Sequence, residues 1–184
     1  MSGGDGRVII LLRGINVGGK NRLPMNDLAR LLEGLGLEDV ETYIQSGNAV
    51  GRSVGEAVST LGEALRAAIE ERHGFRPLVL VLGADRLSEA VAANPFPEAA
   101  DEPGFLHLFF LARPPPSPDL DSLAKIAAGS ERFHLARDVF YLHTPDGFGR
   151  SKLAGRVEKL LGVAATARNW RTVSKLREMV DAMR

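Results

Sequence analysis

The fold is decided by the first apolar segment and the loop after it, where residues 8–22 read VIILLRGINVGGKNR. The five apolar residues at 8–12 predict a buried β-strand. Residues 13–22 hold three glycines, two asparagines and three cations. This composition suits a core poorly, but it can bring backbone N–H groups and positive charge close to an anion. We therefore predict an ordered, anion-binding loop directly after the first strand.

The segments that follow continue in an order typical of one small α+β unit. Apolar spacing predicts a helix over 25–35, strands over 40–44 and 48–50, a helix over about 54–73 and a strand over 78–82. The two middle strands form a hairpin around Ser46-Gly47, and Gly36 and Gly74 end the two helices. The order strand–helix–strand–strand–helix–strand is the split βαβ, or ferredoxin-like, unit.

The second half of the chain echoes the first without a residue-level repeat. Its predicted segments are a helix over about 85–93, a strand over 106–111, a helix from Ser117, a hairpin of 133–135 and 139–142, a helix near 153–161 and a last helix over 173–183. We predict an α+β fold of two ferredoxin-like subdomains with antiparallel sheets. The expected division is 1–83 and 84–184, with the extra C-terminal helix in the second subdomain.

Composition excludes several classes of protein. The chain has 184 residues, no cysteine and a formal net charge of zero. Disulfides, thiol catalysis and thiolate metal sites are therefore excluded. No apolar run approaches the roughly 18 residues needed to cross a bilayer, and the first residues lack a signal-peptide pattern. We expect a cytoplasmic protein with no membrane partner and no cofactor.

The charges are unevenly distributed along the chain. Residues 7–30 carry five Lys or Arg against one acid, and residues 151–184 carry eight against three. The segment 31–150 carries ten against eighteen. A balanced total argues against a general polyanion binder, whereas this segregation permits a local anion site. Charges scattered over solvated helix faces are the structural alternative.

The loop also resembles a P-loop, because Gly14 and Gly19-Lys20 have its spacing after a strand. Asn21 stands where that motif needs a Ser or Thr for magnesium, and Pro24 falls where its helix should run. We therefore disfavour a nucleoside triphosphatase. A loop that merely turns is a further alternative.

Two later segments are candidates for anion or ring binding. Residues 149–152 read GRSK at an expected helix start, where a phosphate could bind, although Ser151 could equally be an ordinary helix cap. Residues 166–172 read TARNWRT and contain the single Trp170, which could stack on a ring or act as a packing anchor. The four histidines are dispersed and predict no metal site or catalytic triad.

Four blocks of the chain resemble one bacterial family, called domain of unknown function 1697. The blocks are residues 12–25, residues 42–48, residues 149–153 and residues 166–173. The resemblance implies a compact cytoplasmic protein of two ferredoxin-like subdomains, and it implies no established activity. Gly51 departs from the apolar residue usual in that family, which leaves the length of its strand open.

These observations lead to a first hypothesis, a small anionic, phosphorylated or nucleotide-like ligand bound in a cleft between the subdomains. The candidate binding residues are Arg13, Gly14, Asn16, Gly18, Gly19, Lys20, Arg22, Ser46, Asn48, Arg150, Lys152, Arg168, Asn169 and Trp170. Of these, Ser46 and Asn48 rank lowest, because we expect their hairpin at the opposite end of the sheet from the loop. The alternatives are an RNA-binding module, disfavoured by the neutral charge and few aromatics, and a non-catalytic interaction scaffold. Oligomeric state stays open.

Overall fold

A computed structural model of the chain describes residues 6–53 and 58–183. The chain forms two compact units, residues 1–89 with 175–184 and residues 90–174. This division differs from the expected one after residue 83, because the chain leaves the first unit within α3 (Ala84–Ala92) and returns to it within α6 (Trp170–Ala182).

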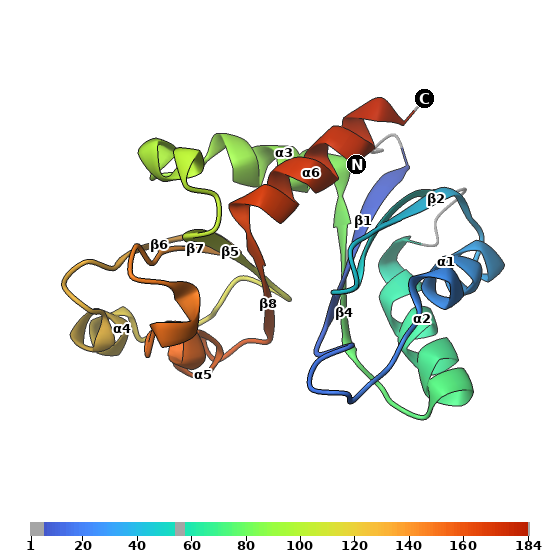
Figure 1. Cartoon of the computed structure of the whole chain (residues 1–184), viewed down its shortest axis with the longest axis horizontal. Coiled ribbons are helices and arrows are strands. Elements are labelled where there is room, and N and C mark those ends of the chain that lie inside the picture. The colour runs from blue at the N-terminus through green and yellow to red at the C-terminus, as the bar shows by residue number, and fades with distance from the viewer. Residues whose placement is uncertain (1–5, 54–57, 184) are drawn as a thin grey trace. The chain divides into compact units, whose positions relative to one another are not determined.

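The first unit contains one antiparallel sheet with the strand order β2-β3-β1-β4. Its elements are β1 (Arg7–Arg13), α1 (Met25–Gly34), β2 (Leu37–Tyr43), β3 (Asn48–Ser53), α2 (Val58–His73) and β4 (Leu78–Gly83). Helices α1 and α2 cover one face of this sheet (Figure 1). Strand β3 continues through Gly51, which pairs with Val8, so the glycine does not shorten the strand.

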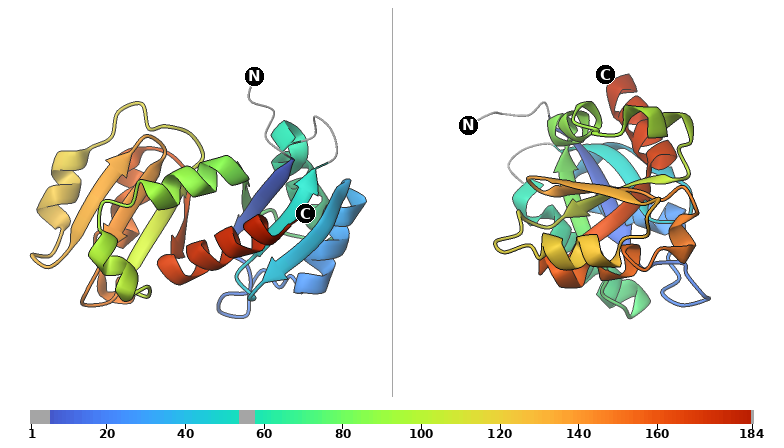
Figure 2. Two further views of the ribbon diagram at one scale, coloured as in Figure 1. Left: turned by 90° about the horizontal axis from the view of Figure 1, so that it is seen from above. Right: turned by 90° about the vertical axis from the view of Figure 1, so that its left-hand side faces the viewer.

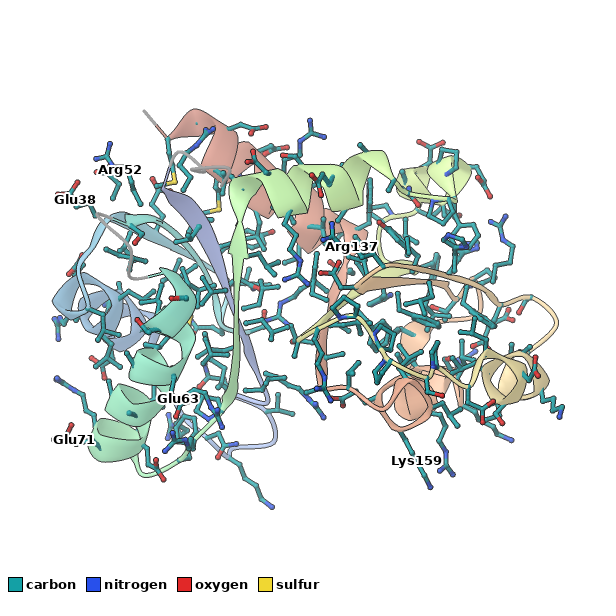
Figure 3. The ribbon with its side chains drawn as sticks, turned by 180° about the vertical axis from the view of Figure 1, so that it is seen from behind. Glu38, Arg52, Glu63, Glu71, Arg137 and Lys159 are labelled. Atoms are coloured by element: carbon teal, nitrogen blue, oxygen red, sulfur yellow. The ribbon has the colours of Figure 1, made fainter. Side chains whose placement is uncertain are left out.

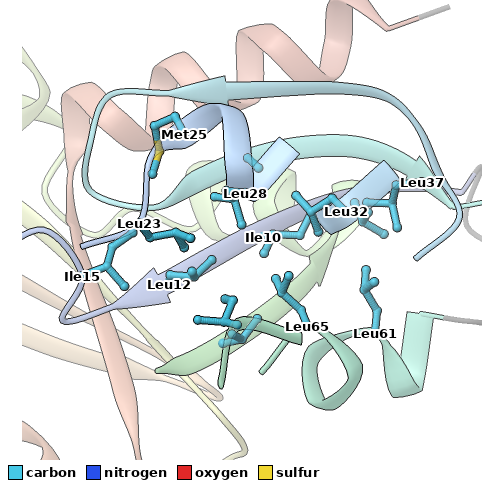
Figure 4. Packing of buried hydrophobic residues seen from close by; sticks show 14 residues of the cluster. Ile10, Leu12, Ile15, Leu23, Met25, Leu28, Leu32, Leu37, Leu61 and Leu65 are labelled. Atoms are coloured by element: carbon cyan, nitrogen blue, oxygen red, sulfur yellow. The ribbon is translucent and has the colours of Figure 1, made fainter. Parts of the chain in front are cut away.

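A single apolar cluster joins the sheet of the first unit to its helices (Figure 4). Ile10 and Leu12 of β1 pack with Leu28 and Leu32 of α1 and with Leu65 of α2. All five are fully buried. The spacing of three to four residues in α1 is what the sequence predicted. Strand β1 is buried at every position from Val8 to Leu12, as its uninterrupted apolar run predicted.

The second unit repeats the arrangement, with the strand order β6-β7-β5-β8. Its elements are β5 (Leu106–Leu111), α4 (Leu120–Ile126), β6 (Arg132–Ala136), β7 (Val139–His143), α5 (Val157–Leu161) and β8 (Ala165–Asn169), with short 3-10 helices at Pro97–Asp101, Phe148–Arg150 and Ala154–Arg156. The predicted fold class, mixed α and β with two four-stranded antiparallel sheets, is confirmed. It is consistent with two ferredoxin-like subdomains.

Two elements of the second unit differ from the sequence prediction. Strand β8 was missed, because Thr166 and Arg168 alternate with alanines and no apolar periodicity marks the strand. Helix α4 begins at Leu120 rather than at Ser117, because Asp119 caps it by accepting a hydrogen bond from Ser122 N at 3.0 Å.

Within the described ranges, no helix has both the length and the apolar character that a membrane span requires.

Candidate functional site

The loop 13–22 is ordered by its own backbone and asparagine side chains. Asn16 N donates to Asn21 O at 3.1 Å, and Asn21 Nδ2 donates to Gly14 O at 2.9 Å. At the tip, Lys20 N donates to Val17 O, which closes a tight turn over Gly18-Gly19. Both tip glycines have a positive φ, 58° and 75°, a backbone conformation that is unfavourable for residues with a side chain.

The hairpin turn between β2 and β3 lies against this loop, not at the opposite end of the sheet (Figure 2). Asn16 Nδ2 donates to Gln45 O at 2.8 Å, and Leu12 N donates to Gly47 O at 2.8 Å. The expectation that placed them apart is therefore wrong. Both β1 and β2 run antiparallel to β3, so they point the same way and end at the same edge.

Two of the three asparagines proposed to contact a ligand, Asn16 and Asn48, use their amide donors within the protein. Asn16 Nδ2 donates to Leu23 O as well as to Gln45 O, and its Oδ1 accepts from Leu23 N. Asn48 Nδ2 donates to Tyr43 O at 3.0 Å and to Ser46 Oγ at 2.9 Å. Each amide nitrogen has only two hydrogens, so these contacts account for both. Asn16, Ser46 and Asn48 thus fasten the loop and the turn.

Replacing Asn16 with alanine is expected to lower the free energy of unfolding by about 2 kcal/mol, because three hydrogen bonds are lost. Asn21→Ala is the matched control, since both residues have φ near +50° but the side chain of Asn21 makes one hydrogen bond, to Gly14 O. Its cost should stay below about 1 kcal/mol. Chemical denaturation measures both. Equal losses would mean that the backbone conformation, and not the bonds to the hairpin turn, decides the stability of the loop.

The cations of the loop face solvent. Arg13, Lys20 and Arg22 are all exposed. Lys20 and Arg22 take part in no ion pair within the described part of the chain. The loop therefore offers positive charge on a preformed turn, while both amide donors of Asn16 are engaged within the protein.

Residues 166–172 in the second unit have structural contacts. Arg168 lies on β8, is 9% exposed, and donates from Nη1 to Thr166 Oγ1 and Ala167 O, both at 2.9 Å. Burial lowers the pKa of Arg168 to about 10. Asn169 caps α6, because its Oδ1 accepts from Thr172 N at 2.9 Å, and Trp170 is the half-buried first residue of that helix.

A cationic hollow lies on the second unit beside residues 151–160. Its volume is about 470 Å³, and it is lined by Ile126, Ser151, Lys152, Gly155, Arg156, Lys159 and Leu160. The hollow is bounded on one side by the end of α4 and on the other by the segment leading into α5. Asp119 N, directly before the start of α4, donates to Leu160 O of α5 at 2.9 Å and ties the two helices together. Lys159 extends outward from α5 (Figure 3).

The lining of this cationic hollow carries no carboxylate. Lys152, Arg156 and Lys159 are exposed, and the described residues hold no ion pair to any of them. Their nearest acid in sequence, Glu158, is engaged elsewhere, because its Oε1 accepts from Ala165 N at 2.9 Å. Three like charges therefore share a small concave surface without internal compensation.

The sequence predicted only one of the three cations that line this hollow. Lys152 was a candidate, whereas Arg156 and Lys159 were missed, and Arg150 is exposed but does not line the hollow. The expected capping role of Ser151 is present, since its Oγ accepts from Ala154 N at 3.0 Å. The available signal was the spacing of 152, 156 and 159, four and three residues apart, although Lys152 lies in a turn before the 3-10 helix that holds Arg156 and before α5, which holds Lys159.

A hollow of about 570 Å³ on the first unit has a different character. Asp39 and Glu41 of β2 line it together with Lys175, Glu178 and apolar residues of α6. Three of its four charged side chains are paired, since Lys175 Nζ lies 3.2 Å from Glu178 and Asp39 lies 2.7 Å from Arg52. The neighbouring Arg52–Glu38 pair sits at the exposed edge of the sheet (Figure 3). Surplus acid makes this hollow unsuitable for an anion.

Two histidines of the second unit have perturbed pKa values. Burial lowers the pKa of His107 to about 4, and its ring stacks on Phe148 with centroids 3.8 Å apart. Burial and the adjacent Arg132 lower the pKa of His143, whose Nδ1 lies 3.2 Å from Arg132. Arg132 also pairs with Glu98 and stacks over Phe96, whereas the buried Nε2 of His143 has no hydrogen-bond partner among the described residues. No metal-binding group of histidines and acids occurs among the described residues.

Comparison with known proteins agrees with this architecture. The solved structure of the conserved bacterial protein SP0830 from Streptococcus pneumoniae is similar, with a TM-score of 0.68 and 24% identity, over 95% of this chain and 98% of that one. At this identity the similarity concerns the fold alone. No curated protein matched the chain. A family model matches residues 6–141, which include the glycine-rich loop and the hairpin turn that fastens it. The chain therefore belongs to the family described as protein of unknown function (DUF1697).

Proposed function

We propose that this protein binds a small phosphorylated ligand in the cationic hollow of its second unit. One observation carries the proposal: Lys152, Arg156 and Lys159 share a concave surface whose lining holds no carboxylate. Concentrating like charges is unfavourable unless an anion offsets them. A bound phosphate group would supply that missing charge.

The chemistry of the lining suits a phosphate ester better than a bare ion. Ammonium and guanidinium groups form charge-assisted hydrogen bonds with phosphate oxygens. Ser151 accepts a hydrogen bond with its Oγ, so its hydroxyl hydrogen remains able to donate to a ligand. Ile126 and Leu160 add apolar surface at the same hollow, against which the organic part of the ligand could pack.

The loop 13–22 enters this proposal as a competing site. Its glycines and cations favour an anion, but Asn16 and Asn48 have their amide donors engaged. Lys20 is the exposed cation at its tip. The variant Lys20→Ala therefore separates a loop site from a hollow site.

Calorimetric titration with inorganic phosphate, phosphoserine and AMP tests the proposal. We expect the esters to bind more tightly than inorganic phosphate, and Lys159→Ala to weaken binding about tenfold or more, as loss of a charged hydrogen bond does. Gly155→Asp should weaken binding similarly, because it adds a carboxylate to the lining where a side chain has open space. The matched controls are Arg113→Ala and Gly149→Asp, exposed positions of the second unit that do not line the hollow.

Several results would contradict the proposal. One is an affinity for the phosphate esters that is unchanged in Lys159→Ala but weakened in Lys20→Ala, which would place the anion at the loop 13–22. Another is binding of an oligouridylate strand far more tightly than any of the small phosphates, which would favour the RNA-binding alternative. Equal effects of the hollow variants and their controls would indicate general charge screening.

A further inference from the structure

The two most exposed large apolar side chains lie on adjoining turns of the first unit. Val17 is 68% exposed and Ile44 is 51% exposed, and the described part of the chain has one other such residue, Leu120, at 40%. Single exposed aliphatic residues are common on protein surfaces. These two are different because Asn16, beside Val17, bonds directly to Gln45, beside Ile44.

Both side chains are presented on turns that internal contacts hold in place. Val17 accepts the bond from Lys20 N that closes the loop tip. Ile44 has a φ of 49°, a conformation that β-branched residues rarely adopt. Figure 4 shows Ile15 and Leu23, at the base of the loop, packed toward Leu12 of β1. A surface that is already ordered loses little conformational entropy when a partner binds.

Within the two sequence segments that form these turns, every charged side chain is positive. Lys20 and Arg22 are exposed and have no ion pair within the described residues. No acid occurs in residues 13–26 or in residues 42–53. We define the Val17–Ile44 face as Val17, Lys20, Arg22 and Ile44. It combines aliphatic contact with uncompensated positive charge.

From this combination we propose that the Val17–Ile44 face docks an acidic polypeptide segment that carries an aliphatic or aromatic side chain. The cations match the carboxylates of such a segment, and Val17 and Ile44 match its apolar residue. A nucleic acid fits less well, because base recognition on single strands uses exposed aromatic rings and Tyr43, the neighbouring aromatic residue, is half-buried. This face belongs to the first unit and is independent of the phosphate hollow.

Selection of a random 12-residue peptide library on the full-length protein tests the proposal. We expect enrichment of peptides that contain Asp or Glu together with at least one Leu, Ile, Val or Phe. The double variant Val17→Ser/Ile44→Ser should weaken the enriched peptides about tenfold or more, and so should Lys20→Glu/Arg22→Glu. Leu120→Ser is the matched control, because it removes an exposed aliphatic side chain from the second unit.

The remaining outcomes overturn the inference. The inference is overturned if no peptide is enriched or if basic peptides are enriched. It is also overturned if acidic peptides bind equally strongly without an apolar residue. The same holds for enriched peptides that lose affinity in Leu120→Ser but not in the Val17/Ile44 variant. Circular dichroism of each variant confirms that the fold is retained. Binding of phosphoserine in the second unit should be unchanged throughout, so failure here does not bear on the phosphate hollow.

Discussion

Replacing Gly47 with alanine should lower the free energy of unfolding by about 3 kcal/mol, the largest effect we expect from one methyl group in this protein. Gly47 has a φ of 80°, which costs an alanine about 1 kcal/mol. The added Cβ would also stand 2.7 Å from Leu12 Cβ and 2.8 Å from Ile15 Cδ1. Both neighbours are fully packed core residues, so neither can move cheaply.

Gly14→Ala provides the matched control for Gly47→Ala. Gly14 has a similar φ of 72°, but a Cβ built there meets no atom within 4 Å. The Gly14→Ala variant should therefore lose only the free energy of unfolding that the positive φ costs an alanine, about 1 kcal/mol. Urea denaturation of both variants measures the difference. If both lose the same free energy, the close approach of the hairpin turn to Leu12 and Ile15 contributes nothing to stability.

Acidification should destabilise the second unit through His107. Its pKa is about 4 in the folded protein against an ordinary value of 6.5. Between these values the unfolded chain binds a proton that the folded protein does not, so the free energy of unfolding falls as the pH falls through this window. The contribution is complete above about pH 6.5 and lost below about pH 4, a change of about 3 kcal/mol.

His107→Phe tests this pH dependence, because the new ring can keep the stack on Phe148 without titrating. The variant should lose about 3 kcal/mol less than the wild type between about pH 7 and about pH 4. Carboxylates common to both proteins cancel in this comparison. An NMR titration of the His107 ring gives the folded pKa directly. A value near 6.5, or parallel stability curves, would contradict the account.

The sequence predicted the loop 13–22, but the predicted position of the hairpin turn between β2 and β3 was wrong. Val8 to Leu12 are apolar without interruption, so β1 and the glycine-rich loop after it could be located from the sequence. The adjacency of the hairpin turn follows from strand direction alone and was available in principle. What could not be predicted is that Asn16 and Asn48 use their amide donors to fasten these turns, because hydrogen-bond partners depend on tertiary packing.

The second unit was harder to predict for a different reason. Strand β8 buries Thr166 and Arg168, residues that a sequence pattern assigns to the surface. The spacing of the cations at 152, 156 and 159 is visible in the sequence, but their lack of compensating negative charge is not. That lack of compensation depends on Glu158, whose Oε1 accepts a hydrogen bond from the backbone N–H of Ala165.

Amide chemical-shift mapping with phosphoserine most directly tests the central claim, that an anion binds in the cationic hollow. We expect saturable shifts at Ser151, Gly155, Arg156 and Lys159, with an affinity weakened about tenfold or more in the Gly155→Asp variant and unchanged in Gly149→Asp. Residues 13–22 should not shift. Saturable shifts confined to residues 13–22, or only a linear drift across residues 151–160 that the Gly155→Asp variant shares, would contradict the claim.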